Sequence, residues 1–259
     1  MISILITHYN RPEVLEKCIS SLRKLAWGSI PIEIVVSDDA SKEITQRFIK
    51  KLPIDKLIIS PVNKGLTSNI NTGIRNCSGK YILYCQEDFI PKMELVERLP
   101  EIIKVLDSGM ADMVRLKANY KFPKLLKLTE NIKLIPKFSW QNFYLNTFQY
   151  SDHPFIVNKS FFNTYGYYLE NTSGAYGENE YAIRIMKSNA RIAIVNSYLF
   201  TSNSVAVSVI EKTEFRKKRT LFKKIKLYKF IRAVRLHLEY LFYSNKKRRL
   251  LSIRNKRKI

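Results

Sequence analysis

Polar side chains gather in three clusters within residues 1–90, and each cluster directly follows an apolar run. The clusters occupy residues 7–11, 38–39 and 86–88. Their members that could bind a ligand or a metal ion are Thr7, His8, Tyr9, Asn10, Arg11, Asp38, Asp39, Gln86, Glu87 and Asp88. Turn and capping chemistry would account for a single Asp pair after a strand. The recurrence of such clusters at three places indicates one composite binding site.

The residue types in these clusters suit a sugar that is attached to a nucleotide through two phosphates. The ring of Tyr9 can pack on a base, and a carboxylate of Asp38 or Asp39 can accept a hydrogen bond from a base N–H. Asp88 can ligate Mg²⁺ or Mn²⁺, and such an ion neutralises the charge of two phosphates. The clusters therefore favour a nucleotide-sugar site.

Apolar runs at residues 2–7, 32–36, 57–60 and 81–85 have the composition of buried strands. The segments between them have helical spacing, and the first begins with a sequence at residues 10–13 that resembles a capping box. Alternating strands and helices predict an α/β fold with a mostly parallel sheet and helices on both faces. Ligands of such sheets bind beyond the carboxyl ends of the strands, where the three clusters lie.

The remaining elements are a predicted helix over residues 91–106, a strand over 113–116 and a helix that opens at residues 177–181. Residues 120–150 are aromatic, basic and weakly periodic, so we expect loops and short strands there. We expect one domain over residues 1–210 and a basic helical tail over residues 211–259.

The ordered motifs resemble those of the family-2 glycosyltransferases, which have a GT-A fold. The resemblance rests on residues 4–12, 36–41, 63–65, 71–73 and 79–88, and it covers roughly residues 1–200. It implies that the loop of Thr7 and Tyr9, together with Asp38, Asp39, Asn63 and Lys64, contacts the nucleotide. It also implies transfer of a sugar to an acceptor hydroxyl.

The triplet at residues 86–88 matches the family's DxD position, but Gln86 replaces the usual first Asp. By this resemblance Asp88 faces the divalent metal ion, Mn²⁺ or Mg²⁺. The first acidic residue of the motif often contacts ribose in the family, and the amide of Gln86 can do the same.

The family's catalytic base lies late in the domain, at the start of a helix, where this sequence reads Gly-Glu-Asn-Glu-Tyr-Ala-Ile-Arg at residues 177–184. Alignment on Glu180 and Arg184 puts Glu178 in the base position, with Glu180 as its substitute. Alignment on Gly177 puts Asn179 there, and an amide cannot take a proton. Both carboxylates could instead serve only the dipole of a helix N-terminus. A base at Glu178 would support direct displacement, which inverts the anomeric centre.

Positive charge is concentrated in the tail: residues 211–259 hold 19 lysines and arginines against three acidic residues, in a chain of net charge +23. Residues 221–242 predict an amphipathic helix that binds an anionic membrane surface. Its apolar face would consist of Leu227, Ile231, Val234, Leu238 and Leu241. Aromatic side chains suited to the headgroup boundary are Tyr228, Tyr240, Phe242 and Tyr243, and basic clusters flank the helix at residues 216–219 and 246–249. The same spacing also fits a helix packed on the catalytic domain or on a second copy of the chain.

The sequence has no secretory signal pattern, no apolar run of membrane-spanning length and no paired cysteines. We therefore expect a cytoplasmic protein that lies peripherally on the inner face of the cell membrane. P-loop, GxGxxG and GxSxG motifs are absent. Among the histidines, His153 is a weak candidate for the acceptor site.

These observations predict a metal-dependent inverting glycosyltransferase that uses a UDP-sugar and a glycan or lipid-linked acceptor. The expected setting is the biosynthesis of bacterial cell-surface polysaccharide, lipopolysaccharide or capsule. Two alternatives stay open. One is a nucleic-acid-binding protein whose basic tail is its working part, although strand-end acids would repel phosphate. The other is a sugar-nucleotide-binding protein with a degenerate catalytic site, given Gln86 and Asn179.

Overall fold

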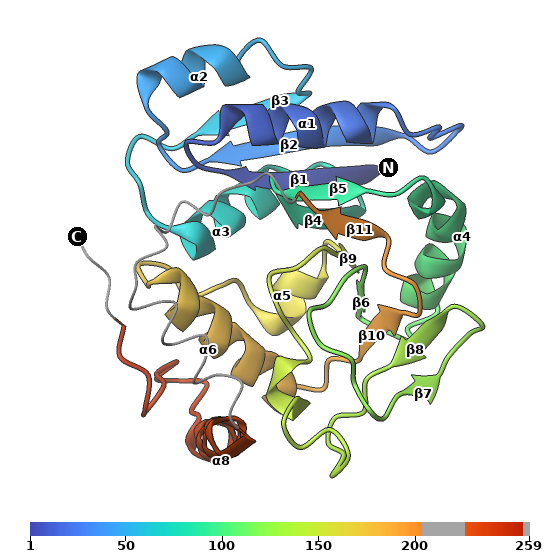
Figure 1. Ribbon diagram of the computed structural model, residues 1–259. Helices are drawn as coiled ribbons and strands as arrows, with labels where there is room; N and C mark the ends of the chain where they lie inside the picture. The colour runs from blue at the N-terminus through green and yellow to red at the C-terminus, as the bar shows by residue number, and fades with distance from the viewer. Residues whose placement is uncertain (204–225, 256–259) are drawn as a thin grey trace.

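A mixed sheet lies at the centre of the computed structural model, which describes residues 1–203 and 226–255 (Figure 1). Within these residues the main sheet has nine strands in the order β3-β2-β1-β4-β9-β6-β10-β8-β7. Its strands are β1 (Ile2–His8), β2 (Ile32–Asp38), β3 (Lys56–Ile59), β4 (Tyr81–Gln86), β6 (Met113–Arg115), β7 (Leu126–Lys127), β8 (Ile132–Leu134), β9 (Phe155–Asn158) and β10 (Ile192–Val195). A second small sheet pairs β5 (Phe89–Pro91) with β11 (Phe200–Ser202).

The first half of the main sheet is parallel, as predicted. β1 pairs in parallel with β2 and β4, and β2 pairs in parallel with β3. The other half is mixed, because β9 enters between β4 and β6 and runs antiparallel to both. The predicted α/β fold is confirmed, with a mixed sheet in place of a mostly parallel one.

The carboxyl ends of β1, β2 and β4 lie side by side at the point where the strand order reverses. The register sets Thr7 beside Gln86 and His8 beside Asp38. The three clusters of the sequence therefore meet at one edge of the sheet, where α/β sheets bind ligands.

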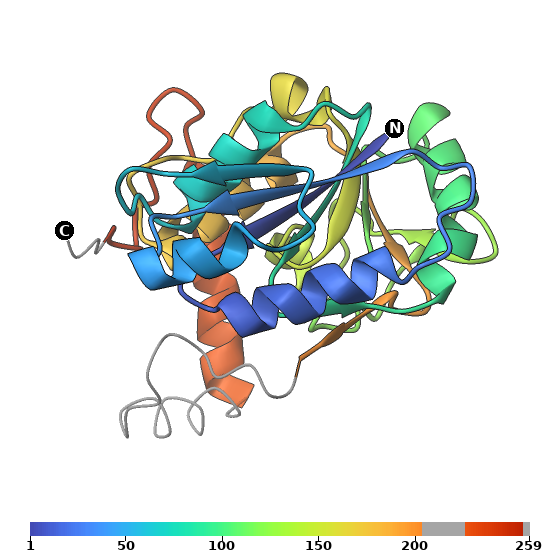
Figure 2. The same cartoon turned by 90° about the horizontal axis from the view of Figure 1, so that it is seen from above.

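Helices cover both faces of the sheet (Figures 1 and 2). One apolar core joins the sheet to α1, α2 and α4, and a second core on the opposite face joins it to α3, α5 and α6. β1 is buried on both sides, since Ile4 and Ile6 belong to the first core and Leu5 to the second. The helices are α1 (Pro12–Arg23), α2 (Glu43–Ile49), α3 (Leu66–Asn76), α4 (Glu94–Asp107), α5 (Phe161–Tyr165), α6 (Gly174–Lys187) and α8 (Lys226–Phe242), with one 3₁₀ turn, η1 (Asn146–Phe148).

The tail helix α8 packs against α6 with one face and leaves its predicted apolar face in solvent. Ala233, Leu236 and Glu239 of α8 are buried. A small third core adds Tyr243 and Leu250 to residues of α6. The predicted stripe from Leu227 to Leu241 lies on the opposite, outer side. The helix thus packs on the domain, as in the alternative expectation, but not through the face that was expected to pack.

Several parts of the tail prediction lie outside the described residues, namely the domain boundary at 210, the basic cluster at 216–219 and the helix start at 221–225. None of the helices in the described ranges is both long enough and apolar enough to cross a bilayer.

Candidate active site

His8 and Asp38 pair with each other below the surface at the ends of β1 and β2. His8 Nδ1 lies 2.7 Å from Asp38 Oδ2, and both side chains are fully buried. His8 Nε2 accepts a hydrogen bond from the backbone N–H of Arg11, so Nδ1 carries the proton that Asp38 accepts. Burial alone would raise the pKa of Asp38, but hydrogen bonds from His8 and Ser41 lower it. The hydrogen bonds of both residues hold the loop after β1 in place.

Asp39 fixes the turn at residues 63–65. Its two carboxylate oxygens accept backbone hydrogen bonds from Lys64 and Gly65, each at 2.8 Å. Gly65 has a φ of 84° and a ψ of 166°, a conformation that favours glycine. The side chains of Asn63 and Lys64 are thereby presented to solvent beside the edge of the sheet.

Hydrogen bonds join the loop after β1 to the loop after β2. Asn10 has a left-handed backbone (φ 53°), its N–H donates to Ser41, and its side chain accepts from the N–H of Lys42. Tyr9 and Asn10 remain partly exposed, whereas Thr7 is buried and hydrogen-bonds Tyr84. The exposed members of this loop are the ones free to meet a ligand.

Arg11 faces the acidic residues that follow β4. Its Nη1 lies 3.2 Å from Glu87 Oε1, and its Nη2 lies 3.9 Å from Asp88 Oδ2. Burial raises the pKa of Glu87, while the positive charge of Arg11 opposes that rise. A cation and two carboxylates therefore share the place where a diphosphate is expected.

Gln86 connects this edge to a pair of carboxyl groups. Its side-chain N–H donates to Asp152 Oδ2 at 2.8 Å. The backbone N–H of Asp152 in turn lies 3.4 Å from Glu178 Oε1. Burial, and then the negative charge of Asp152, raise the pKa of Glu178 to about 8. A carboxyl whose pKa is perturbed by burial and by a charged neighbour is common at acid–base centres.

Glu178 and Asp152 line a cavity of about 340 Å³. His153 lies in the same wall, with its ring 5.5 Å from that of Phe89, and burial lowers its pKa. Helix α8 closes the opposite side with Tyr228, Arg232 and Arg235, whose 4-3 spacing puts them on one helical face. The other lining residues are Asn119, Tyr120, Phe148, Tyr150, Ser151, Asn179 and Ala182.

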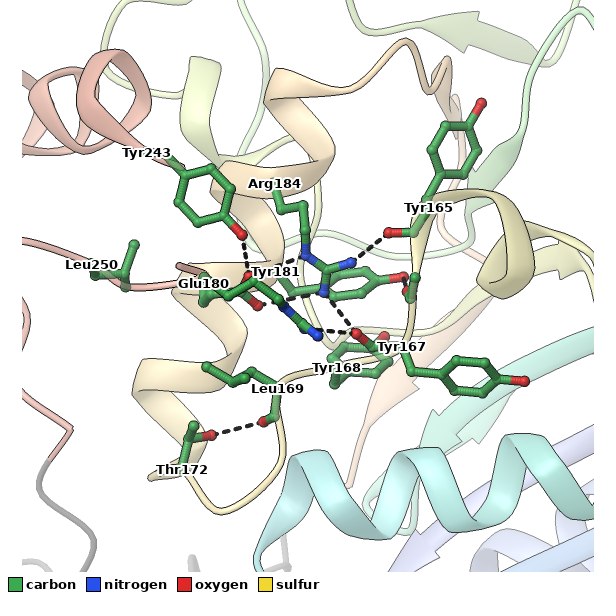
Figure 3. Close-up of polar contacts among 12 residues, drawn as sticks. Tyr165, Tyr167, Tyr168, Leu169, Thr172, Glu180, Tyr181, Arg184, Tyr243 and Leu250 are labelled. Carbon is green, nitrogen blue, oxygen red and sulfur yellow. Dashed lines mark hydrogen bonds and ion pairs between the residues drawn. The ribbon is translucent and has the colours of Figure 1, made fainter. Parts of the chain in front are cut away.

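Glu180 is not among the residues that line this cavity, and its side chain lies in a buried ion-pair network (Figure 3). Its Oε1 lies 3.1 Å from Arg184 Nε and 3.4 Å from Arg248 Nε, and it also accepts a hydrogen bond from Tyr243. Two residues along a helix correspond to a turn of about 200°, which separates Glu180 from Glu178. Glu180 therefore has the surroundings of a structural ion pair, and these contacts favour Glu178 over Glu180 as the predicted base.

Comparison with known proteins places the chain in a family. The model of the family described as "Glycosyl transferase family 2" matches residues 3–166, more than half of the chain. The chain belongs to this family. The assignment favours a glycosyltransferase over the nucleic-acid-binding alternative.

Individual relatives support the same assignment. Glycosyltransferase GlyA of Streptococcus pneumoniae is 34% identical over 101 residues, which are 38% of this chain and 14% of GlyA. The chain thus spans a small part of that relative.

Two solved structures share the fold. Staphylococcus aureus TarS 1–349 in complex with UDP-GlcNAc has a TM-score of 0.57 and 16% identity, over 95% of this chain and 74% of that one. The mannosyltransferase PcManGT of Pyrobaculum calidifontis, in complex with GDP-Man and Mn²⁺, has a TM-score of 0.54 and 16% identity, over 95% and 71% of the two chains. These similarities confirm the GT-A fold.

A carboxylate that could hold a divalent ion near the end of β4 is that of Asp88. Its Oδ1 is buried and has no hydrogen-bond partner within residues 1–203 and 226–255. The described residues contain no group of three or more His, Cys, Asp or Glu side chains that could hold a metal by themselves. Mg²⁺ is commonly held by one or two carboxylates together with substrate phosphates. Asp88 fits an ion that arrives with the diphosphate of the donor.

Sequence reasoning missed Asp152 and the contributions of α8. Asp152 lies in a loop whose position depends on Arg115, and Arg115 Nη1 donates to the backbone carbonyls of Phe148 and Gln149. A buried arginine inside a predicted strand was the available signal, because such a residue must bind partners. No periodicity could place Arg232 and Arg235 against the cavity, since their partners are distant in the sequence.

Proposed function

We propose that this chain transfers a sugar from a nucleotide-sugar donor, a UDP-sugar, to an acceptor hydroxyl with inversion at the anomeric carbon. The observation that carries the proposal is the connected set Gln86, Asp152 and Glu178. It joins the strand-end edge expected for the donor to a carboxyl pair in a separate cavity. Direct displacement requires the donor to lie next to the base and the acceptor, and this set connects the two places.

The donor would bind at the ends of β1, β2 and β4. Tyr9, Asn10 and Arg11 are accessible there, as are Asn63 and Lys64. His8, Asp38 and Asp39 would act indirectly, because their polar atoms already hold the loops that carry these residues. The positive charge of Arg11 would face the diphosphate, and an ion at Asp88 would neutralise part of its charge.

Glu178 is the proposed base. Its carboxylate takes the proton of the acceptor hydroxyl as the acceptor oxygen forms a bond to the anomeric carbon, and the bond from that carbon to the diphosphate breaks. A raised pKa makes the carboxylate a stronger proton acceptor than an ordinary glutamate, at the cost of a smaller ionised fraction at neutral pH.

The acceptor would occupy the cavity between α6 and α8. The rings of Tyr120 and Phe148 offer a surface for a sugar, and His153 lies in the same wall. We propose a glycan or lipid-linked acceptor of bacterial cell-surface polysaccharide, lipopolysaccharide or capsule assembly, used at the cytoplasmic face of the membrane. The exposed apolar side of α8, beside this cavity, supports the membrane location.

The test is a pair of substitutions on one helix, measured with a panel of UDP-, GDP- and dTDP-sugars in the presence and absence of Mn²⁺. Glu178→Gln should lower kcat by about 10²-fold or more with little change in donor affinity, the pattern of a lost general base. Glu180→Gln should instead lower thermal stability, because Arg184 and Arg248 lose their carboxylate. Unchanged turnover in a folded Glu178→Gln protein would remove Glu178 from the mechanism. A turnover rate that is the same with Mn²⁺, without Mn²⁺ and with a chelator would exclude a metal ion from the mechanism.

A further inference from the structure

The outer side of α8 is an apolar stripe that no described part of the chain covers. Its strongly exposed members each keep between 47% and 65% of their surface in solvent. They are Leu227, Phe230, Ile231, Leu238, Leu241 and Phe242. Val234 lies in the same sector of the helix. A stripe of this width on an otherwise packed helix marks an interaction surface.

An aromatic loop at residues 138–144 extends this stripe. Trp140 is 79% exposed, and Phe138 and Tyr144 are about half exposed. The loop touches the helix directly, since the ring of Phe143 lies 6.0 Å from that of Phe230 and stacks at 4.7 Å on that of His237. Two segments about ninety residues apart in the sequence therefore form one apolar surface, which we call the outer surface.

A cavity of about 490 Å³ opens where the loop meets the helix, and it combines cations with apolar walls. Phe138 and Leu241 belong both to the outer surface and to this cavity. Its cations are Lys137 and Lys187, whose ammonium groups donate to backbone carbonyls. His237 Nε2, also in the lining residue set, is buried without a partner within the described part of the chain. Lys187 donates its three N–H groups to the carbonyls of residues 240, 241 and 243, and His237 Nδ1 donates to the carbonyl of Ala233, which makes Nε2 an acceptor. The cavity therefore adds positive charge beside the outer surface through Lys137 and Lys187.

We propose that the outer surface docks on an anionic phospholipid membrane, with the positive charges of Lys137 and Lys187 beside it. Exposed Trp and Tyr beside an aliphatic stripe are typical of the interface between water and lipid. The exposed basic residues Lys229, Lys246 and Lys247 lie on or just beyond the same helix, and a net charge of +23 draws the protein to an anionic surface.

A second copy of the chain fits this surface less well. A symmetric dimer brings the same patch of two copies together, so Lys137 and Lys187 beside the stripe, on two chains of net charge +23 each, would approach their counterparts. Like charges at an interface are unfavourable, whereas an anionic bilayer satisfies them.

Only the role of the docking, which is to bring a lipid-linked acceptor to the cavity, rests on the proposed function. Tyr228, Arg232 and Arg235 line the acceptor cavity from the flank of the helix next to the stripe. A membrane under α8 would therefore bring a lipid-linked acceptor to the cavity. Lipid binding itself is measured without any turnover, so either proposal can fail alone.

The experiment uses the full chain and vesicles of phosphatidylcholine with and without phosphatidylglycerol. Cosedimentation should be at least ~10-fold stronger with phosphatidylglycerol and should fall as salt rises. The double substitution Ile231→Asp and Leu238→Asp should lower it at least ~10-fold. The matched control is Ile44→Asp, since Ile44 is 77% exposed on α2, on the opposite side of the molecule (Figure 1). Thermal melts establish that all variants fold.

A second readout uses the tryptophans. Trp140 should shift its fluorescence to shorter wavelength on anionic vesicles, and Trp140→Phe should abolish the shift, because Trp27 lies in the packed part of the domain. Lipid binding unchanged by the double substitution would overturn the proposal. So would a dimer that the substitution dissociates in a protein that binds no vesicles.

Discussion

The carboxyl pair of Asp152 and Glu178 determines the pH dependence expected of this enzyme. Burial and the neighbouring charge raise the pKa of Glu178, so its active, ionised form becomes abundant only at alkaline pH. The rate at low substrate concentration should therefore rise with pH toward about 8. Asp152→Asn removes the neighbouring charge, so the rise should move to lower pH. A pH profile of kcat/KM measures this shift.

Stability gives an independent check on the same group. The folded-state pKa of Glu178 is above the unfolded value, so the protonated carboxyl stabilises the fold at low pH, and this contribution is lost as pH rises through the folded-state pKa. The Glu178→Gln variant has no carboxyl at this position, so its stability should lack this pH-dependent contribution. Two results together would contradict the raised pKa of Glu178. The pH profile of kcat/KM in Asp152→Asn would match that of the wild-type protein, and the pH dependence of the melting temperature in Glu178→Gln would match that of the wild-type protein as well.

At the scale of residues, the sequence located the polar clusters but could not assign a task to each member. The acids after β2 looked alike, yet Asp38 binds His8 while Asp39 binds the turn at Lys64. Glu178 was the predicted base and Glu180 its substitute, and the sequence could not show that Glu180 binds tail residues 63 and 68 positions away. Contacts over such separations leave no local pattern.

At the scale of elements, the approach of α6 to α3 positions the proposed base. A Cβ atom on Gly177 would lie 2.3 Å from Thr67 Cγ2 of α3 and 2.6 Å from Thr172 Oγ1. Gly177→Ala should therefore push α6 outward and displace the adjacent Glu178. We expect a loss of about 1–3 kcal/mol in stability together with a fall in kcat.

Gly174→Ala is the matched control for this substitution. The same helix offers open space there, with the nearest atom 3.9 Å from an added Cβ. Thermal melts and kcat of the two variants should differ clearly. Equal behaviour would show that α6 adjusts freely and does not need the glycine.

Helix α8 shows what an amphipathic pattern can and cannot predict. Its periodicity identified the helix and its apolar stripe, and the helix is present. The pattern could not say that a second face, with Ala233, Leu236 and Glu239, would pack on the domain. Tyr243 was expected near lipid headgroups, but it is buried against Glu180. Small and polar residues can be buried where specific partners exist, and hydrophobicity alone does not indicate those partners.

At the scale of the whole molecule, the tail is part of the fold around α6. A chain that ends at residue 203 would lose Tyr243, Arg248 and Leu250, which cover Glu180 and the side chains of Tyr176 and Ile183. Removing partners of a buried carboxylate costs about 3 kcal/mol or more. We expect a fall in melting temperature of roughly 10 °C or loss of soluble protein.

The variant Arg248→Met in the full chain should show a smaller fall in melting temperature, since Arg184 and Tyr243 remain. A truncated protein as stable as the full chain would show that residues 226–255 pack only weakly.

The mixed half of the sheet belongs to the same scale. The antiparallel direction of β9 depends on the path of the weakly patterned residues before it, so the sequence pattern did not predict it.

The pairing of Glu180 with Tyr243 and Arg248 also sets an order of events on the ribosome. Helix α6 is translated first, and its buried carboxylate waits for partners 63 and 68 residues downstream. At about 5–20 residues per second, that interval lasts roughly several seconds, plus the time for the tail to leave the exit tunnel. Until then α6, and with it Glu178, lacks its final support. In a nascent chain, β1, β2 and β4, which carry the proposed donor site, would be synthesised early, whereas α6 with Glu178 would reach its final packing last. Catalytic activity would therefore arise only after the tail has been translated.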